Sequence, residues 1–169
     1  MNDFADFTEE ELAGKTVFNQ HCATCHNTPT SEFGFEGPSI IDPFLSFQPH
    51  NTGLDELTTD LGVANHSGWE GDEGKFKTVN LKNVALTGPY MHDGRFETLE
   101  DVVDFYSDEI QNHPNSTFTT QPQYIDVDIF PQPFAGFGFT DQEKSDLVTF
   151  LHTLTDEVLI NSPMWSDPF

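Results

Sequence analysis

The sequence has few basic residues: 6 lysines and arginines stand against 29 aspartates and glutamates, and the formal net charge is −23. A surface of this sign repels nucleic-acid phosphates and anionic lipid headgroups, which excludes roles in binding DNA, RNA or a membrane surface. No apolar run approaches the roughly 20 residues that a membrane-spanning helix needs. A protein partner is therefore expected to dock through a basic face.

A signal peptide is also lacking, because the chain opens MNDF, with neither a basic start nor an apolar stretch. Hydrophobic residues make up only 36% of the 169 residues, although 17 phenylalanines each offer a large apolar area. The length suits one domain, spanning residues 1–169. The composition favours a core that a bound apolar cofactor helps to complete.

Cysteine is scarce too, and its placement is informative. The two cysteines lie in Cys22-Ala23-Thr24-Cys25-His26, which is the C-x-x-C-H pattern of c-type haem attachment. Two thiols three positions apart on one helical turn can each add to a haem vinyl group, and the following histidine then presents its imidazole to the iron. The pattern predicts one covalent haem c, with His26 as the proximal ligand.

Three other uses of the cysteines fit the surrounding sequence less well. A dithiol redox pair follows a strand in a βαβ unit, whereas a helix is expected before this motif. A zinc site needs further ligands at local spacing, and there is no second cysteine pair. A disulfide does not require the histidine that follows.

Three helices are expected from capping boxes and from the spacing of apolar residues. The first begins at Thr8 and runs to about Asn19, directly before the cysteine motif. The second begins at Thr98, and apolar residues at i, i+3, i+4 and i+7 place Tyr106 on its inward face. The third begins at Thr140 and carries an apolar stripe as far as residue 158.

Two long stretches between these helices lack helical spacing. Residues 27–75 are rich in Gly, Pro, Asn and Asp and show no clear strand, and residues 107–139 are rich in Pro, Gln and Phe. Within the second stretch, residues 124–129 alternate as a short strand does. The sequence therefore predicts an all-α domain with long irregular loops.

Two short patterns on either side of these loops resemble class I c-type cytochromes. Gly14 and Phe18 stand before the cysteines as in the N-terminal helix of that fold, and residues 147–154 resemble its C-terminal helix. In such proteins the glycine permits a close crossing of the first and last helices, and the aromatic residue packs beside it. The resemblance implies a class I c-type cytochrome domain.

A longer stretch, GKFKTVNLKNVALTGPYMHDGRFETLEDVVDFY at 74–106, resembles the C-terminal haem domain of the bacterial di-haem cytochrome c peroxidase family, which includes methylamine-utilisation enzymes. The family pattern is F-K-x-P-x-L-R-N-V-x-x-T-x-P-Y-x-H-D-G, followed by T-L-x-E-V-V. Residues 50–55 and 139–157 match as well, so the resemblance covers nearly the whole chain. The exception is 107–139, which is longer than usual in the family and is interpreted as a loop insertion.

The chain departs from this family in two ways. The family's proline is Val79 here and its arginine is Lys82, which can meet a haem propionate only as a point charge. The family also has an N-terminal haem domain with its own C-x-x-C-H motif, whereas this chain has one motif. The resemblance implies either a C-terminal module whose preceding domain is absent or a stand-alone mono-haem relative.

The resemblance also indicates what lies opposite His26. In the family the sixth iron ligand stands fourteen residues after the histidine of P-Y-x-H-D-G, and that position is Tyr106 when counted from His92. Methionine occupies it in the peroxidases and tyrosine in the methylamine-type enzymes. Met91 is the alternative ligand, because Met/His ligation is common in c-type haems, and an open iron is a third possibility.

Other positions carry weaker implications. His92 matches a family histidine that faces the other haem, where it tunes the site or the electron path; a loop-stabilising hydrogen bond is the alternative. The carbonyls of Thr87 and Pro89 match a calcium site between the two family domains, for which another ligand comes from the missing domain. The remaining aromatic and imidazole side chains are interpreted as packing or surface residues: His21, His50, His66, His113, His152, Trp69 and Trp165.

These expectations converge on electron transfer by a mono-haem cytochrome domain, with a redox protein or a second haem domain as partner. The alternative function is a haem peroxidase that acts on hydrogen peroxide in its own right, which requires an open iron and a nearby acid. A third is a docking domain whose haem is structural. Attachment of haem c by this motif takes place outside the cytoplasm, so the resemblance implies a periplasmic or extracellular location.

Overall fold

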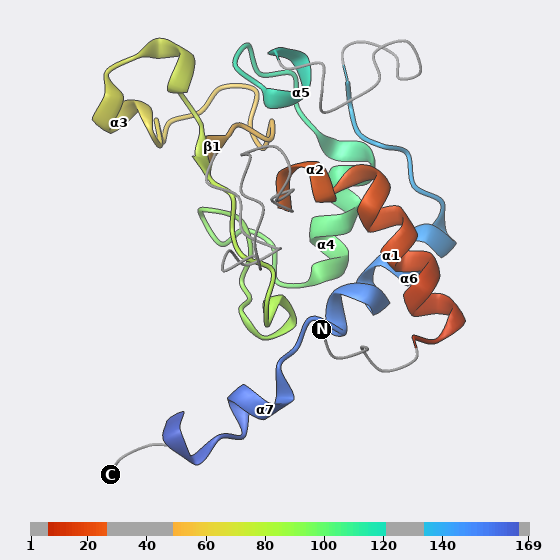
Figure 1. Ribbon diagram of the computed structural model, residues 1–169. Coiled ribbons are helices and arrows are strands. Elements are labelled where there is room, and N and C mark those ends of the chain that lie inside the picture. Colours follow the sequence, from red (N-terminus) through yellow and green to blue (C-terminus); the bar gives the residue numbers. More distant parts are fainter. Residues whose placement is uncertain (1–6, 27–48, 121–133, 166–169) are drawn as a thin grey trace, which may run out of the picture.

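A computed structural model describes residues 7–26, 49–120 and 134–165 (Figure 1). The α-helices in these ranges are α1 (Glu9–His21), α2 (Ala23–His26), α3 (Ala64–Ser67), α4 (Leu99–Asp104), α5 (Thr117–Thr120), α6 (Asp141–His152) and α7 (Glu157–Ile160). Shorter turns are η1 (Glu70–Asp72), η2 (Val84–Leu86), the π-helical turn η3 (Phe105–Glu109) and η5 (Pro163–Trp165). The expected all-α class is confirmed, and none of the described helices is long and apolar enough to span a bilayer.

The three expected helix starts are confirmed, each with its capping box. In α1 the Thr8 hydroxyl accepts the Glu11 N–H at 3.2 Å, and the Glu11 carboxylate accepts the Thr8 N–H at 2.7 Å. Thr98 begins α4 and Thr140 begins α6 in the same way. Each box satisfies amide donors that the first helical turn leaves without partners.

The first and last long helices cross closely, as the resemblance to class I cytochromes implied. α1 and α6 lie side by side in Figure 1, and Gly14 is buried where they meet. A side-chain carbon at Gly14 would overlap the backbone carbonyl of Asp146, so only glycine fits. Phe18 packs on Phe150 beside the crossing, with ring centroids 5.3 Å apart.

The apolar residues around this crossing form a first core cluster. Its members come from α1, α4, α6 and the segments before them: Val17, Phe18, Leu81, Val84, Leu99, Val103, Phe139, Leu147, Val148, Phe150 and Leu151. Cys22 and Ala23 pack against its edge, so the cysteine motif borders the core. A second core cluster consists of Phe105, Ile110, Phe118 and Phe134.

The last helix is shorter than its apolar stripe predicted. α6 ends at His152, and Val158, expected on the buried stripe, lies in α7 and is 83% exposed. The chain is turned by Asn83, whose N–H donates to the Leu154 carbonyl at 3.0 Å and whose side-chain oxygen accepts the Asp156 N–H at 2.6 Å. A tertiary contact therefore overrides the local periodicity.

The loops contain two features that the sequence did not predict. Strand β1 (Pro49–His50) pairs antiparallel with β2 (Phe76–Lys77), although no strand was expected within 27–75. The pair forms between segments distant in sequence, which periodicity over two residues cannot reveal. The second is the helical turn α5 within the predicted insertion at 107–139. The strand predicted at 124–129 lies outside the described residues.

The crossing at Gly14 gives a direct test of the fold. Gly14→Ala in the haem-loaded protein should lower the free energy of unfolding by about 1–3 kcal/mol, because the new methyl group meets backbone that cannot move without shifting α6. Denaturant unfolding measures the change. Asn19→Ala, at an exposed position of the same helix, is the control and should have little effect. Equal stability of the two variants would contradict the close crossing.

Candidate haem site

The cysteine motif forms one helical turn at the end of α1. The Cys22 N–H donates to the Phe18 carbonyl at 2.8 Å, and the Cys22 carbonyl accepts the N–H groups of Cys25 and His26 at 3.1 and 3.0 Å. Cys22 and Cys25 are free thiols, and burial raises the pKa of each to about 12. The turn thus presents two protonated thiols and an imidazole together, which is the arrangement that the motif predicted.

The His26 ring is held by a backbone carbonyl. Its Nδ1 lies 3.2 Å from the Val79 carbonyl oxygen, which can only accept, so Nδ1 carries the proton. Burial lowers the pKa of His26 to about 4; the Val79 bond opposes this shift and nearby His50 adds to it. The imidazole is therefore neutral at neutral pH and leaves the Nε2 lone pair to bind a metal.

The contact through the Val79 carbonyl shows why valine can stand where the family pattern has proline. Val79 stands where the family has proline, and its side chain is 59% exposed, yet its main-chain oxygen orients the ring. The contact needs the backbone position and not the side chain. Sequence reasoning missed the role of Val79, because a main-chain carbonyl is present in every residue type and leaves no signature in the sequence.

Tyr106 is brought to the same site. It lies in the π-helical turn η3, and its ring packs against Phe105 with centroids 5.0 Å apart. Burial and the charges of Cys25 and Cys22 raise the pKa of the phenol above its ordinary value, while a hydrogen bond with Thr52 opposes the rise. The phenol is therefore within electrostatic reach of both thiols, and it is neutral unless a cation displaces its proton.

Met91 borders the same region. Like Tyr106, it packs against the second core cluster. Its φ of 69° is in the left-handed region, which is unusual for a residue with a long side chain. The structure thus places both candidate ligands beside the same apolar cluster.

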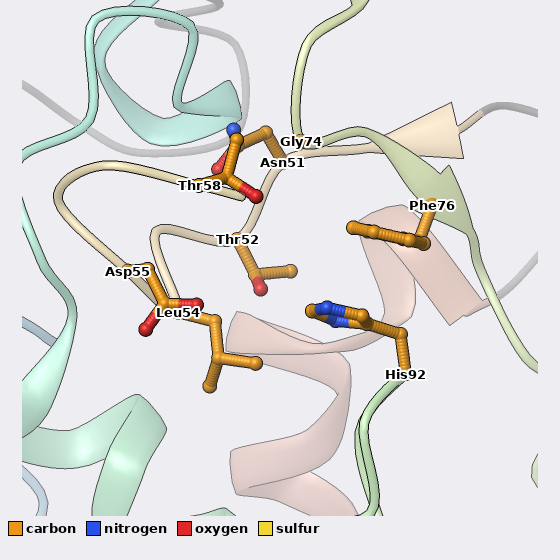
Figure 2. A pocket seen from close by; sticks show the side chains of 8 residues that line it. All are labelled: Asn51, Thr52, Leu54, Asp55, Thr58, Gly74, Phe76 and His92. Carbon is orange, nitrogen blue, oxygen red and sulfur yellow. The ribbon is translucent and has the colours of Figure 1, made fainter. Parts of the chain in front are cut away.

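His92 lies in a small pocket, drawn in Figure 2. Its ring stacks on Phe76 of β2, with centroids 3.8 Å apart and planes 11° from parallel. The contact that the structure shows for His92 is thus an aromatic stack with a residue of the β1–β2 pair. The pocket is lined by Asn51, Thr52, Leu54, Asp55, Thr58, Gly74, Phe76 and His92.

The remaining predicted residues lie at the surface. Lys82 is exposed, and its N–H donates to the Asn80 side chain at 2.8 Å. Thr87 precedes the cis Gly88–Pro89 bond, and both Thr87 and Pro89 are exposed as well. In residues 7–26, 49–120 and 134–165, no three His, Cys, Asp or Glu side chains gather as a metal-binding group.

An ion-pair network that sequence reasoning missed holds the loop of Met91 and His92. Arg95, the one arginine of the sequence, binds Asp55 through both guanidinium nitrogens Nη1 and Nη2 at 3.0 and 2.9 Å, and its Nε donates to Asp93 at 2.8 Å. Such a two-pronged pair fixes direction as well as distance. It joins residues 50–55 to the P-Y-M-H-D-G loop, which were recognised only as separate family patches.

A buried polar network joins the same segment to the predicted insertion. His113 is 5% exposed, and its Nδ1 accepts hydrogen bonds from the Asn51 amide at 3.1 Å and the Asn115 N–H at 3.0 Å. The Asn51 N–H donates to the Thr117 hydroxyl at 3.1 Å, and the Thr117 N–H donates to the Asn51 carbonyl at 2.8 Å. The network positions Thr52, which follows Asn51 directly and contacts Tyr106.

The other expected packing and surface residues fall as follows. His21 packs on the ring of Phe137, with centroids 4.7 Å apart, and His50 is buried at 6% exposure. His66, His152 and Trp69 are exposed. The side chain of Trp165 lies outside the described residues.

The site residues fit a covalently attached haem. Two reduced thiols and a neutral imidazole share one helical turn, and the apolar first and second core clusters border the site. A porphyrin needs apolar walls on its faces and an unprotonated nitrogen at its iron. These requirements are met by residues from α1, α2, η3 and the segment around Val79.

No family model matches the chain. It is 31% identical to a cytochrome-c peroxidase of Denitromonas iodatirespirans over 90% of this chain and 42% of the relative. It is 30% identical to the methylamine utilization protein MauG of Paracoccus denitrificans over 89% of this chain and 43% of the relative. The chain thus spans less than half the length of these curated relatives.

Two solved structures are also similar. A MauG-like protein associated with microbial copper homeostasis is 34% identical, with a TM-score of 0.68 over 97% of this chain and 49% of that protein. A variant of the diheme peroxidase BthA from Burkholderia thailandensis is 24% identical and has a TM-score of 0.61. At that identity the second match supports the fold alone.

The carbonyl contact to His26 can be tested by restoring the family's proline. Val79→Pro keeps the carbonyl oxygen, so the absorption spectra and midpoint potential of the haem-loaded protein should match those of the unchanged chain. Val79→Gly is the control: it keeps the carbonyl but loosens the backbone, and it should broaden or shift the His26 ring resonances in NMR spectra. A large change of the midpoint potential in the proline variant would show that the Val79 side chain, and not its carbonyl, determines the orientation of the His26 ring.

Proposed function

The chain is a homologue of the bacterial di-haem cytochrome c peroxidases and MauG proteins, and on this basis we propose that it is a mono-haem electron-transfer module. One observation carries the proposal: His26, whose Nδ1 is held by the Val79 carbonyl so that Nε2 stays available, shares a helical turn with both free thiols. Residues 1–169 act in this proposal as one cytochrome domain, with 107–139 as an insertion.

Each site residue has a defined task in this proposal. Cys22 and Cys25 would hold a haem covalently through thioether bonds, and His26 would bind its iron. Tyr106 would be the second iron ligand, with Met91 as the alternative. When bound, haem c supplies an iron that gains and loses one electron. Lys82 meets a propionate as a point charge.

Tyr106 favours electron transfer over peroxide chemistry. Its buried phenol is close enough to Cys25 and Cys22 for them to raise its pKa, which supports a position beside the haem; as an iron ligand it would keep water and peroxide from the iron. The neighbouring Phe105 is 2% exposed, which closes the wall behind the phenol. A filled, apolar face suits electron transfer, because few atoms need to move when the charge of the iron changes.

The partner and location belong to the same proposal. The relatives are about twice as long and carry two haems by family, so the partner is a second haem domain or a separate redox protein. With a net charge of −23, the chain attracts a basic partner surface. The location is periplasmic or extracellular, where c-type haem is attached. His92 stands on the electron path, and the carbonyls of Thr87 and Pro89 are a weak calcium site.

The alternative function, a haem peroxidase that uses hydrogen peroxide directly, draws support from the names of the relatives. It needs an open iron face. The ligation state therefore separates the two functions.

Covalent attachment gives the first test. Acid–acetone extraction should leave the haem on the unchanged chain, because thioether bonds from Cys22 and Cys25 resist it. Removing one thiol, as in Cys22→Ala, should leave a single thioether and shift the reduced pyridine haemochrome band to longer wavelength. Release of free haem from the unchanged chain, or stoichiometric zinc in place of iron, would refute the proposal.

The ligand opposite His26 gives the second test. Tyr106→Phe removes only the hydroxyl, so the protein should fold, but its ferric iron should accept water or added imidazole and its haem should become easier to reduce. The reason is that a phenolate stabilises ferric iron. Met91→Leu is the matched control and should leave the ferric spectrum unchanged.

If Met91→Leu abolishes six-coordination while Tyr106→Phe has no effect, methionine is the ligand and the family alignment is wrong at this position. If neither variant changes the spectrum and the unchanged chain turns over hydrogen peroxide as fast as two-haem relatives, the peroxidase alternative is correct.

A further inference from the structure

Tyr106 lies where a regular helix gives way to a wider turn. α4 ends at Asp104, and Phe105–Glu109 form a π-helical turn. The extra residue of such a turn changes the direction in which side chains leave the helix, and π-turns are rare and frequently occur at functional sites. The direction of the Tyr106 side chain therefore depends on whatever holds this turn.

The C-terminal end of the insertion, residues 135–139, supplies hydrogen bonds to the turn. The N–H groups of Phe137 and Gly138 donate to the carbonyls of Tyr106 and Ser107 at 3.0 and 2.8 Å. The Phe139 N–H donates to the Ser107 hydroxyl at 2.9 Å. Main-chain oxygens of the turn are thus satisfied from outside their own helix, and Tyr106 itself is one of the tethered residues.

Gly136 allows this segment to approach. Its φ is 147°, and a side-chain carbon built there would overlap the backbone carbonyl of Ser107. Gly68, at the end of α3 and away from the turn, has a φ of 66°, but a side-chain carbon there would meet no atom within 4 Å. Substitutions at the two glycines therefore distinguish the effect of the close approach to the turn from the effect of a positive φ alone.

A lysine of α6 holds both ends of the turn. The Lys144 Nζ lies 2.8 Å from a carboxylate oxygen of Asp104 and 2.8 Å from one of Asp108, two residues on either side of Tyr106. Both carboxylates are more than half exposed, so each pair contributes little to stability. The contact matters because it fixes the separation of the two ends against α6.

We propose that residues 135–139, through Gly136, together with Lys144, are a positioning device that aims the Tyr106 phenol at the haem iron. The inference rests on the proposed function, since it concerns the same iron site. It explains why the end of the insertion returns to η3: the insertion orders the turn that carries the ligand. None of these residues touches the haem in this proposal, so they are positioning residues and not ligands.

The test compares Gly136→Ala with Gly68→Ala in the haem-loaded protein. Gly136→Ala should reduce the tyrosinate charge-transfer absorption of the ferric protein, raise the midpoint potential and strengthen the binding of added imidazole by about tenfold, within the range for coupled neighbouring residues. Gly68→Ala introduces the same methyl group at another positive φ, outside the device, and should change none of the three.

Two milder variants keep the test decisive if Gly136→Ala does not fold. Ser107→Ala removes one bond to the segment, and Lys144→Gln removes the contact to both carboxylates. Each should shift the same three quantities in the same direction by a smaller amount. Lys15→Gln, which removes a charge from α1, is the control for net charge.

The variant Tyr106→Phe separates this inference from the proposed function. If Tyr106→Phe alone changes nothing, tyrosine ligation fails and the positioning device fails with it. If Tyr106→Phe changes the spectrum but Gly136→Ala, Ser107→Ala and Lys144→Gln all match the unchanged chain, only the positioning device is wrong. If the device is real, adding Gly136→Ala to Tyr106→Phe should produce no further spectral change.

Discussion

The contact between Gly14 and the backbone of Asp146 is the constraint on which the rest of the site depends. It sets how closely α1 and α6 approach, and therefore where the end of α1 lies. The C-x-x-C-H turn continues α1 from Cys22. The crossing of α1 and α6 therefore determines where the two thiols and His26 lie. α6 in turn carries Lys144 to the π-helical turn. One close packing of two helices thus locates the groups on both sides of the proposed haem.

The loops are ordered by a small number of polar contacts and not by a large core. The sequence has 6 basic residues, and two of them are used to hold loops: Arg95 joins Asp55 to Asp93, and Lys144 joins Asp104 to Asp108. Buried Asn51 and His113 tie the insertion to the segment before Thr52. Long loops carry backbone groups that need partners, and these contacts supply them where helices do not.

The sequence predicted the features whose causes are local. Capping boxes predicted the starts of α1, α4 and α6, and the cysteine spacing predicted the attachment turn. The helix crossing at Gly14 is not local and was expected from the resemblance to class I cytochromes. It failed where distant segments decide the outcome. Asn83 ends the helical stripe before Val158, β1 pairs with β2 across the loop, and the carbonyl of Val79 orients His26 without any side-chain signature. The π-turn at Tyr106 is likewise held by residues 135–139. The apolar spacing after Thr98 therefore predicted that Tyr106 faces inward, but it did not predict the π-helical backbone.

The protonation of the two proposed axial ligands differs in a way that bears on the redox chemistry. Burial lowers the pKa of His26, so the imidazole is ready to bind iron without releasing a proton. Burial raises the pKa of Tyr106, so its phenol binds only where a cation is strong enough to displace the proton. Ferric iron carries one more positive charge than ferrous iron and meets this requirement better. Tyrosine ligation would therefore couple reduction of the haem to proton uptake at Tyr106, whereas ligation by Met91, which has no proton to exchange, would leave the potential independent of pH at this site.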